Sequence, residues 1–171
     1  PTIINGGIIN AYSKNNRLGF GKWMVVEADE SDGSFLKLPH EINIVTNIDF
    51  EHLDYYKTEK NLIKSFEKFI GNIPFYGYSV ICIESTLARK LSKKINTRKI
   101  ITYAYKIKNV DVKIIKIQQI NLKSFFSISI KNNVIPKYSG IYKFEINLLG
   151  EHNVLNATAA IISSILIGTS I

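Results

Sequence analysis

The sequence predicts an α/β fold: a mostly parallel sheet flanked by helices, with a small antiparallel sheet in the second half. Two observations lead to this class. Between residues 42 and 103, short apolar runs alternate with helical segments, and such crossovers are what parallel strands require. Between residues 112 and 148, strand-like runs follow one another with no helix between them, which is typical of an antiparallel meander.

The first half supplies the parallel strands and their helices. Apolar runs at 42–46, 79–83 and 100–103 predict buried strands, and an earlier run at 22–28 predicts another that ends at Glu27 or Ala28. Thr58 is a good N-cap, Gly71 is a plausible helix end, and apolar residues recur between them at helical spacing. A basic helix follows at 86–94. These elements predict a Rossmann-like arrangement.

The second half has a different texture. Runs at 112–117, 125–130 and 142–148 are rich in Ile, Phe, Val and Tyr, and Asn, Gly or Pro separates them. Residues 153–167 are rich in Ala and Ile and predict a buried helix. We find no internal repeat, low-complexity tract or long linker, so we expect one domain.

The composition is that of a globular protein. The 171 residues are 46% hydrophobic and 21% charged, which excludes a disordered chain. No apolar run reaches the roughly 18 to 20 residues of a membrane-spanning helix, and no secretory signal is visible, so we expect no membrane partner. Cys82 lies in an apolar run, which predicts a buried thiol in a reducing, cytoplasmic setting. The chain begins with Pro1, and we expect a fragment.

The net charge of +8 raises the alternative of nucleic-acid binding. Residues 85–143 contain 14 Lys or Arg and one acid, Asp111. However, the chain has 30 Ile, 19 Lys and 16 Asn but only 3 Arg, which indicates compositional bias more than a binding surface. We expect no nucleic-acid partner, and a non-enzymatic module that binds polyanions through 85–143 stays the alternative.

Acidic residues are concentrated after the first predicted strand. Glu27, Asp29, Glu30 and Asp32 lie within six residues. Ligands of open α/β sheets bind outside the carboxyl ends of strands, and crowded carboxylates are favourable beside a cation. The alternative is a solvated acidic turn.

A second polar segment, 46–54, follows the strand at 42–46 and contains His52. If this strand and the one before Glu27 are neighbours in the sheet, His52 and Glu27 converge and make a cation site. The carboxylate suits Mg²⁺, whereas imidazole is more usual on Zn²⁺ or Mn²⁺. The alternative is a surface histidine.

A third segment, 150–157, opens the final predicted helix. Asn153 and Asn156 are three residues apart and therefore share a helical face, where their amides can pair with a nucleobase edge. The alternative is a helix cap. By contrast, 19–22 is not a phosphate-binding loop, because Asn16 and Trp23 replace the required Gly and Ser or Thr, and a strand follows instead of a helix.

Four blocks together resemble the central domain of the Mur ligases. They are E-A-D-E-S-D-G-S-F-L at 27–36, V-T-N-I-D-F-E-H-L-D at 45–54, N-I-P-F-Y-G at 72–77 and G-E-H-N-V-L-N-A at 150–157. The pattern is most similar to the family members that join L-alanine to UDP-N-acetylmuramate. The members that recycle murein tripeptide are the nearest alternative, since they share E-A-D-E.

The resemblance implies an ATP-dependent ligase of peptidoglycan synthesis. ATP phosphorylates the muramoyl carboxylate in the family, and the amino group of L-alanine attacks the acyl phosphate. Glu27 and His52 match the metal ligands and would hold Mg²⁺, whereas His152, Asn153 and Asn156 match the segment that holds adenine. The other acids of 29–32 are left as supporting or substrate-side residues.

The resemblance also implies a domain assignment. Residues 1–171 correspond to the family's central ATP-binding domain, without the upstream phosphate loop and without the two flanking domains. We therefore expect this chain alone not to catalyse ligation.

Overall fold

Residues 1–96 and 99–171 are described by the structure, a computed structural model. They divide into two compact units, Pro1–Leu38 and Pro39–Ile171, each described here by itself. We refer to them as the smaller unit and the larger unit.

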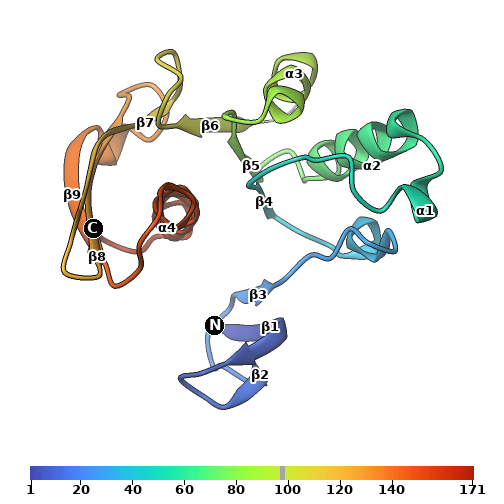
Figure 1. Ribbon diagram of the computed structural model, residues 1–171, viewed down its shortest axis with the longest axis horizontal. Helices are drawn as coiled ribbons and strands as arrows, with labels where there is room; N and C mark the ends of the chain where they lie inside the picture. Colours follow the sequence, from blue (N-terminus) through green and yellow to red (C-terminus); the bar gives the residue numbers. More distant parts are fainter. Residues whose placement is uncertain (97–98) are drawn as a thin grey trace. The chain divides into compact units, whose positions relative to one another are not determined.

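A six-stranded sheet forms the centre of the larger unit (Figure 1). The spatial order of its strands is β4-β5-β6-β7-β8-β9, and β4 to β7 are parallel whereas β7, β8 and β9 are antiparallel. This confirms the predicted fold class, and the antiparallel strands continue the parallel sheet. The bounds are Ile42–Val45 for β4, Tyr78–Cys82 for β5, Ile100–Ala104 for β6, Val112–Ile120 for β7, Lys123–Ile130 for β8 and Gly140–Ile146 for β9.

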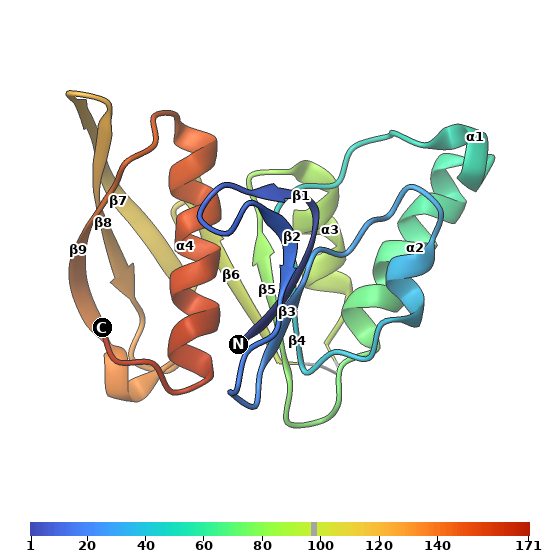
Figure 2. The ribbon, with the colours of Figure 1, turned by 90° about the horizontal axis from the view of Figure 1, so that it is seen from below.

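Helices cover both faces of this sheet. α2 (Glu59–Gly71) and α3 (Thr86–Lys94) lie on one face, and α4 (Glu151–Leu166) lies on the other (Figures 1 and 2). Thr58 caps α2 as predicted, because its hydroxyl accepts a hydrogen bond from the Asn61 amide at 3.2 Å. The shorter helices are α1 (Leu53–Tyr56), η1 (Ser34–Lys37) and η2 (Pro136–Tyr138).

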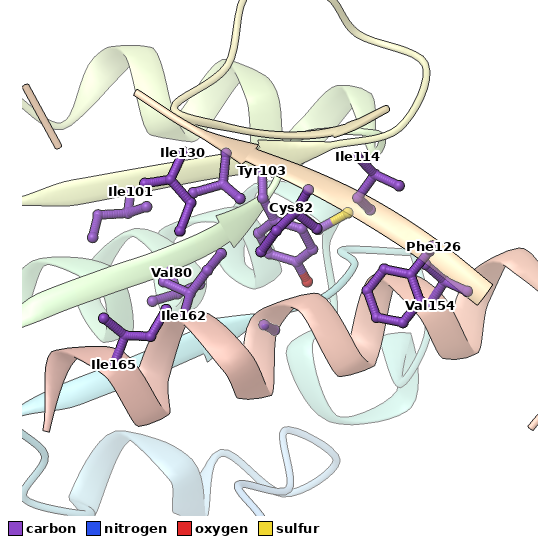
Figure 3. Close-up of a cluster of buried hydrophobic side chains, with 13 residues drawn as sticks. Val80, Cys82, Ile101, Tyr103, Ile114, Phe126, Ile130, Val154, Ile162 and Ile165 are labelled. Atoms are coloured by element: carbon purple, nitrogen blue, oxygen red, sulfur yellow. The ribbon is translucent and has the colours of Figure 1, made fainter. Parts of the chain in front are cut away.

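The core between the sheet and α4 consists of apolar side chains from both (Figure 3). Val80 and Ile101 face Ile162 of α4, which is fully buried. Cys82 is also in this cluster and is 1% exposed, so the predicted buried thiol is confirmed, and burial raises the pKa of this thiol. The Tyr103 ring lies beside it with its hydroxyl directed toward α4.

A three-stranded sheet with the order β2-β1-β3 makes up the smaller unit. β1 (Thr2–Ile9) is antiparallel to β2 (Lys14–Arg17) and parallel to β3 (Met24–Val26). A strand therefore does form within the predicted run at 22–28, but it is not buried, and the condition that it neighbours the strand at 42–46 is not met. β3 pairs with the unpredicted β1 instead, and because β3 is an edge strand, Met24 and Val25 are more than half exposed.

The glycine-rich stretch 19–22 has no regular secondary structure and precedes β3, not a helix, which agrees with its rejection as a phosphate loop. A Cβ on Gly19 would lie 2.1 Å from the Pro1 carbonyl oxygen, so glycine is required by packing there. In the described part of the chain, none of the helices is long and apolar enough to cross a membrane.

Candidate functional site

The carboxyl edge of the parallel strands in the larger unit brings together the loops after β4, β5 and β6 and the start of α4. The Ser85 hydroxyl, which caps α3 after β5, donates a hydrogen bond to the Ile48 carbonyl in the loop after β4 at 3.3 Å. The Lys106 ammonium, after β6, lies 2.7 Å from the Glu151 carboxylate at the start of α4. In an open α/β sheet this is the edge where ligands bind.

His52 lies in the segment that follows β4, directly before α1. Its backbone has a φ of 56° in the left-handed region, which directs the chain from the loop into the helix. The side chain is 36% exposed, and its Nε2 lies 4.0 Å from the Glu51 carboxylate. The imidazole is therefore accessible to a ligand and sits in a negative environment that favours a cation.

Glu27 follows β3 in the smaller unit and is exposed. Its Oε2 accepts a hydrogen bond from the Gly6 amide of β1 at 2.6 Å. A Cβ on Gly6 would lie 3.2 Å from the same oxygen, so glycine lets the carboxylate approach the strand closely. Because β3 and β4 belong to different sheets, the argument that joined Glu27 to His52 through neighbouring strands fails. Their joint binding of a metal stays a prediction.

Two of the other acids after β3 stabilise the turn that leads into η1. The Asp29 carboxylate accepts a hydrogen bond from the Ser31 amide at 2.8 Å, and the Asp32 carboxylate accepts one from the Ser34 amide at 2.8 Å. The hydrogen bonds from Ser34 hold the pKa of Asp32 below its ordinary value. These contacts support the alternative of an acidic turn for Asp29 and Asp32.

The start of α4 carries the three residues predicted to contact adenine. Asn153 is half-buried and its amide donates a hydrogen bond to the Leu149 carbonyl at 2.7 Å, whereas Asn156 is exposed. His152 is exposed and packs over Gly150, where a Cβ would lie 2.7 Å from the ring. Gly150 is the N-cap residue, so neither asparagine caps the helix. The hydrogen bond to the Leu149 carbonyl uses one donor of the Asn153 side-chain amide and orients this side chain.

Glu84 and Lys106 were missed by the sequence analysis. One carboxylate oxygen of Glu84, two residues after β5, accepts hydrogen bonds from the backbone amides of Tyr105 at 2.6 Å and Lys106 at 2.5 Å. The hydrogen bond and the negative charge of Glu151 raise the pKa of Lys106. An acid two residues beyond a buried strand was the signal for Glu84; Lys106 was hidden by the general excess of lysine in 85–143.

Within residues 1–96 and 99–171, no three His, Cys, Asp or Glu side chains gather into a metal-binding cluster. A cleft of about 340 Å³ lies at the opposite, amino edge of the parallel strands, beside Tyr78, Lys99 and Asp111. It is separate from every residue singled out in the sequence as a ligand.

A family model described as the Mur ligase middle domain matches residues 21–164. The chain belongs to the Mur ligase family. This places the four sequence blocks and the observed α/β architecture in one family.

The chain is similar to curated UDP-N-acetylmuramate–L-alanine ligases. It is 48% identical over 161 residues to that of Methylocella silvestris, which covers 94% of this chain and 34% of the relative. It is 47% identical, with the same coverage, to that of Rhodopseudomonas palustris. The chain thus spans about a third of the length of these curated relatives.

Solved structures of the family share the fold. A UDP-N-acetylmuramate–alanine ligase from Thermotoga maritima matches with a TM-score of 0.79 and 23% identity, over 99% of this chain and 36% of that one. A UDP-N-acetylmuramate:L-alanyl-γ-D-glutamyl-meso-diaminopimelate ligase from Neisseria meningitides matches with a TM-score of 0.78 and 17% identity, over 99% of this chain and 53% of that one. A Thermotoga maritima MurF ligase in complex with ADP matches with a TM-score of 0.70 and 12% identity, over 99% and 39%.

Proposed function

We propose that this chain is the central ATP-binding domain of a cytoplasmic enzyme that joins L-alanine to UDP-N-acetylmuramate during peptidoglycan synthesis. The observation that carries the proposal is the 48% identity to a ligase of that name over 94% of the chain. The curated relatives that match at 47% to 48% identity are UDP-N-acetylmuramate–L-alanine ligases, and this favours the L-alanine ligase over a tripeptide ligase of the same fold.

The contacts of the lysines do not favour the polyanion-binding alternative. Three lysines of residues 85–143 are ion-paired at 2.7 to 2.8 Å with glutamates: Lys94 with Glu67, Lys106 with Glu151 and Lys123 with Glu145. These pairs neutralise part of the charge that phosphates would otherwise attract.

Glu27 and His52 are the proposed metal ligands. The exposed Glu27 carboxylate is oriented by the Gly6 amide and offers the hard oxygen donor that Mg²⁺ prefers, and the His52 imidazole is accessible. Two protein donors suit Mg²⁺, which usually keeps several waters and binds substrate phosphates. When bound, Mg²⁺ offsets negative charge on the phosphates during transfer. In this proposal, Glu27 and His52 would be the protein ligands that hold this cation.

The first turns of α4 are the proposed adenine site. The amide of Asn156 and the imidazole of His152 are exposed, and Asn153 is oriented by the Leu149 carbonyl. An amide both donates and accepts, which matches the mixed edge of adenine. These residues would bind and orient the nucleotide.

The proposed reaction proceeds in two steps. A muramoyl carboxylate oxygen attacks the γ-phosphorus of ATP, and ADP leaves as an acyl phosphate forms. The amino group of L-alanine then attacks the acyl carbon, loses a proton and expels phosphate, which leaves an amide. No complete phosphate loop occurs in the 171 residues, so we expect the chain alone to bind MgATP weakly and to show no ligation.

The metal assignment is tested in the full-length gene product that carries this sequence. Glu27→Gln and His52→Ala should each lower turnover at saturating Mg²⁺ and ATP by about 100-fold or more, because they remove charge stabilisation in the transition state. Phosphate release stimulated by L-alanine is the measurement. Glu145→Gln, an exposed change in β9, is the control and should leave turnover unchanged. Near-normal turnover in either site variant rejects the assignment.

The nucleotide assignment has a separate test. Asn153→Ala and Asn156→Ala should each raise the KM for ATP several-fold, because one lost hydrogen bond is worth about 0.5–1.5 kcal/mol. Steady-state kinetics with each substrate varied in turn measures this, and Asn132→Ala in the β8–β9 connection is the control. A fixed KM for ATP together with a raised KM for the sugar nucleotide would mean that α4 contacts the other substrate.

A further inference from the structure

The first turn of α4 has no capping side chain of its own. Its N-cap residue is Gly150, and the hydrogen bond from the Val154 amide to the Gly150 carbonyl is long, at 3.3 Å. Glu151, the first residue of the helix, has its carboxylate 2.7 Å from the Lys106 ammonium. This ion pair connects the residue directly before His152 to the end of β6.

Lys106 is itself held in place through its backbone. The Glu84 carboxylate accepts hydrogen bonds from the amides of Tyr105 and Lys106 at 2.6 and 2.5 Å. Hydrogen bonds to an ionised acceptor are the strong ones, and two on one oxygen fix the direction in which the chain leaves β6. The Lys106 side chain therefore starts from a fixed point at the carboxyl edge of the sheet.

Glu84 is tied in turn to α3. The Arg89 guanidinium donates to the Ile83 carbonyl at 3.1 Å and to the Glu84 carbonyl at 3.3 Å. A continuous series of polar contacts thus runs from Arg89 through Glu84 and Lys106 to Glu151. It joins α3, the ends of β5 and β6, and the start of α4.

We propose that Lys106 is a positioning residue for the nucleotide: through its ion pair with Glu151 it holds the first turn of α4 so that His152, Asn153 and Asn156 face the adenine. This inference rests on the proposed function. Lys106 acts through Glu151 and needs no contact with ATP. Its contribution concerns nucleotide binding and not the chemical steps.

The size of the effect follows from the exposure of the pair. The side chains of Lys106 and Glu151 are 66% and 38% exposed, and ion pairs of this kind contribute modestly and are screened by salt. Loss of the pair should raise the KM for ATP about two- to fivefold. The effect should shrink as the ionic strength rises.

The experiment uses the full-length gene product. Lys106→Met and Glu151→Gln should each raise the KM for ATP while kcat and the KM for L-alanine stay unchanged, and the double variant should be no worse than either single one. Lys106→Arg keeps the charge and should restore the wild-type KM. The matched control is Lys94→Met, which breaks the 2.8 Å pair with Glu67 between α3 and α2 at similar exposure, 63% and 33%.

The outcomes separate this inference from the proposed function. A wild type without ATP-dependent ligation overturns both. If the wild type is active, two results would overturn the positioning role alone. One is an unchanged KM for ATP in the Lys106→Met variant, and the other is an equal rise of that KM in the Lys94→Met variant.

Hydrogen exchange gives a readout that needs no activity. The Val154 amide should exchange faster in Lys106→Met than in the wild type, and Lys94→Met should leave it unchanged, because only the former loosens the start of α4. Equal exchange in the Lys106→Met variant and the wild type overturns the inference.

Discussion

Each of the two units of this chain is stabilised internally by a different kind of interaction. In the larger unit, apolar side chains from the sheet and from α4 are buried against one another, and Ile114, Ile128 and Ile162 are fully buried. In residues 1–38, Phe35 is the one buried large apolar side chain, whereas Ile8 and Phe20 are 72% and 106% exposed. The difference indicates that burial of apolar surface stabilises the larger unit, whereas backbone hydrogen bonds between strands stabilise the smaller one.

The smaller unit relies on its ladder of hydrogen bonds. The Thr2 amide donates to the Trp23 carbonyl at 3.0 Å, and the Glu27 amide donates to the Ile4 carbonyl at 2.9 Å. Net contributions of such bonds are modest, about 0.5–1.5 kcal/mol each. The arrangement around Glu27 is therefore less protected than the core of the larger unit.

The sequence provides a separate probe for each unit. Trp23 is the one tryptophan of the sequence and lies in the smaller unit. All four α-helices of the described chain lie in the larger unit. Tryptophan fluorescence and far-UV circular dichroism therefore report on the two units separately.

The largest effect is expected from a cavity in the larger unit. Ile162→Ala should lower the free energy of unfolding by about 2–5 kcal/mol, because it removes a fully buried side chain between α4 and the sheet. Urea unfolding followed by circular dichroism measures this. Ile162→Val, the smaller change, should cost about 0.5–1.5 kcal/mol. An unchanged dichroism midpoint for Ile162→Ala would contradict the burial of α4.

An intermediate effect is expected at Tyr103, whose hydroxyl is buried with no hydrogen-bond partner in the described residues. Burial, and secondarily the Cys82 thiol, raises the pKa of Tyr103 far above its ordinary value. Because Tyr103→Phe removes this unsatisfied hydroxyl, the variant should be about 1 kcal/mol more stable than the wild type at neutral pH.

The same residue predicts a pH dependence. In the unfolded chain tyrosine ionises near about pH 10, whereas folded Tyr103 keeps its proton. The part of the wild-type stability that depends on protonated Tyr103 is thus fully present below about pH 10 and is lost as the pH rises further. The Tyr103→Phe variant should therefore lose less stability at alkaline pH. Urea midpoints below and above this pH test it. A less stable Tyr103→Phe at neutral pH would mean that the hydroxyl has a hydrogen-bond partner.

The smallest effect is expected in the smaller unit. Phe20→Ser should change the free energy of unfolding by no more than about 0.5 kcal/mol, because the ring is exposed. Trp23 fluorescence during urea unfolding measures it. A loss above about 1 kcal/mol would show that the ring is packed, and the contrast between the units would then be weaker.

The sequence predicted the larger unit well because its patterns are local. Apolar residues at helical spacing and the Thr58 cap define α2, and unbroken apolar runs define β4, β5 and β6. β1 and β2 were missed because Asn5, Gly6 and Gly7 interrupt the first and 14–17 is entirely polar. Without β1, the partner of β3 could not be identified, since a strand pattern does not identify its neighbour.

The candidate site likewise has a part that local sequence patterns predicted and a part that they did not. The sequence located Glu27, His52 and the start of α4 by their place after predicted elements, and their ligand roles stay predictions. The polar contacts from Glu84 through Lys106 to Glu151 could not be predicted from the sequence, because they join segments that are far apart along the chain. Only the folded sheet brings the ends of β5 and β6 next to α4.

The strand order of the larger unit has a consequence for synthesis of the chain. From β4 to β9 the spatial order is the chain order, so each strand that leaves the ribosome finds its neighbour already in place at the growing edge of the sheet. α2 and α3 emerge in time to cover one face. The other face stays uncovered until α4, which ends at Leu166, has been made. Until then, the nascent sheet presents Val80, Ile101 and Ile128 to solvent or to chaperones. The helix that finally covers them is the one that carries the proposed adenine contacts.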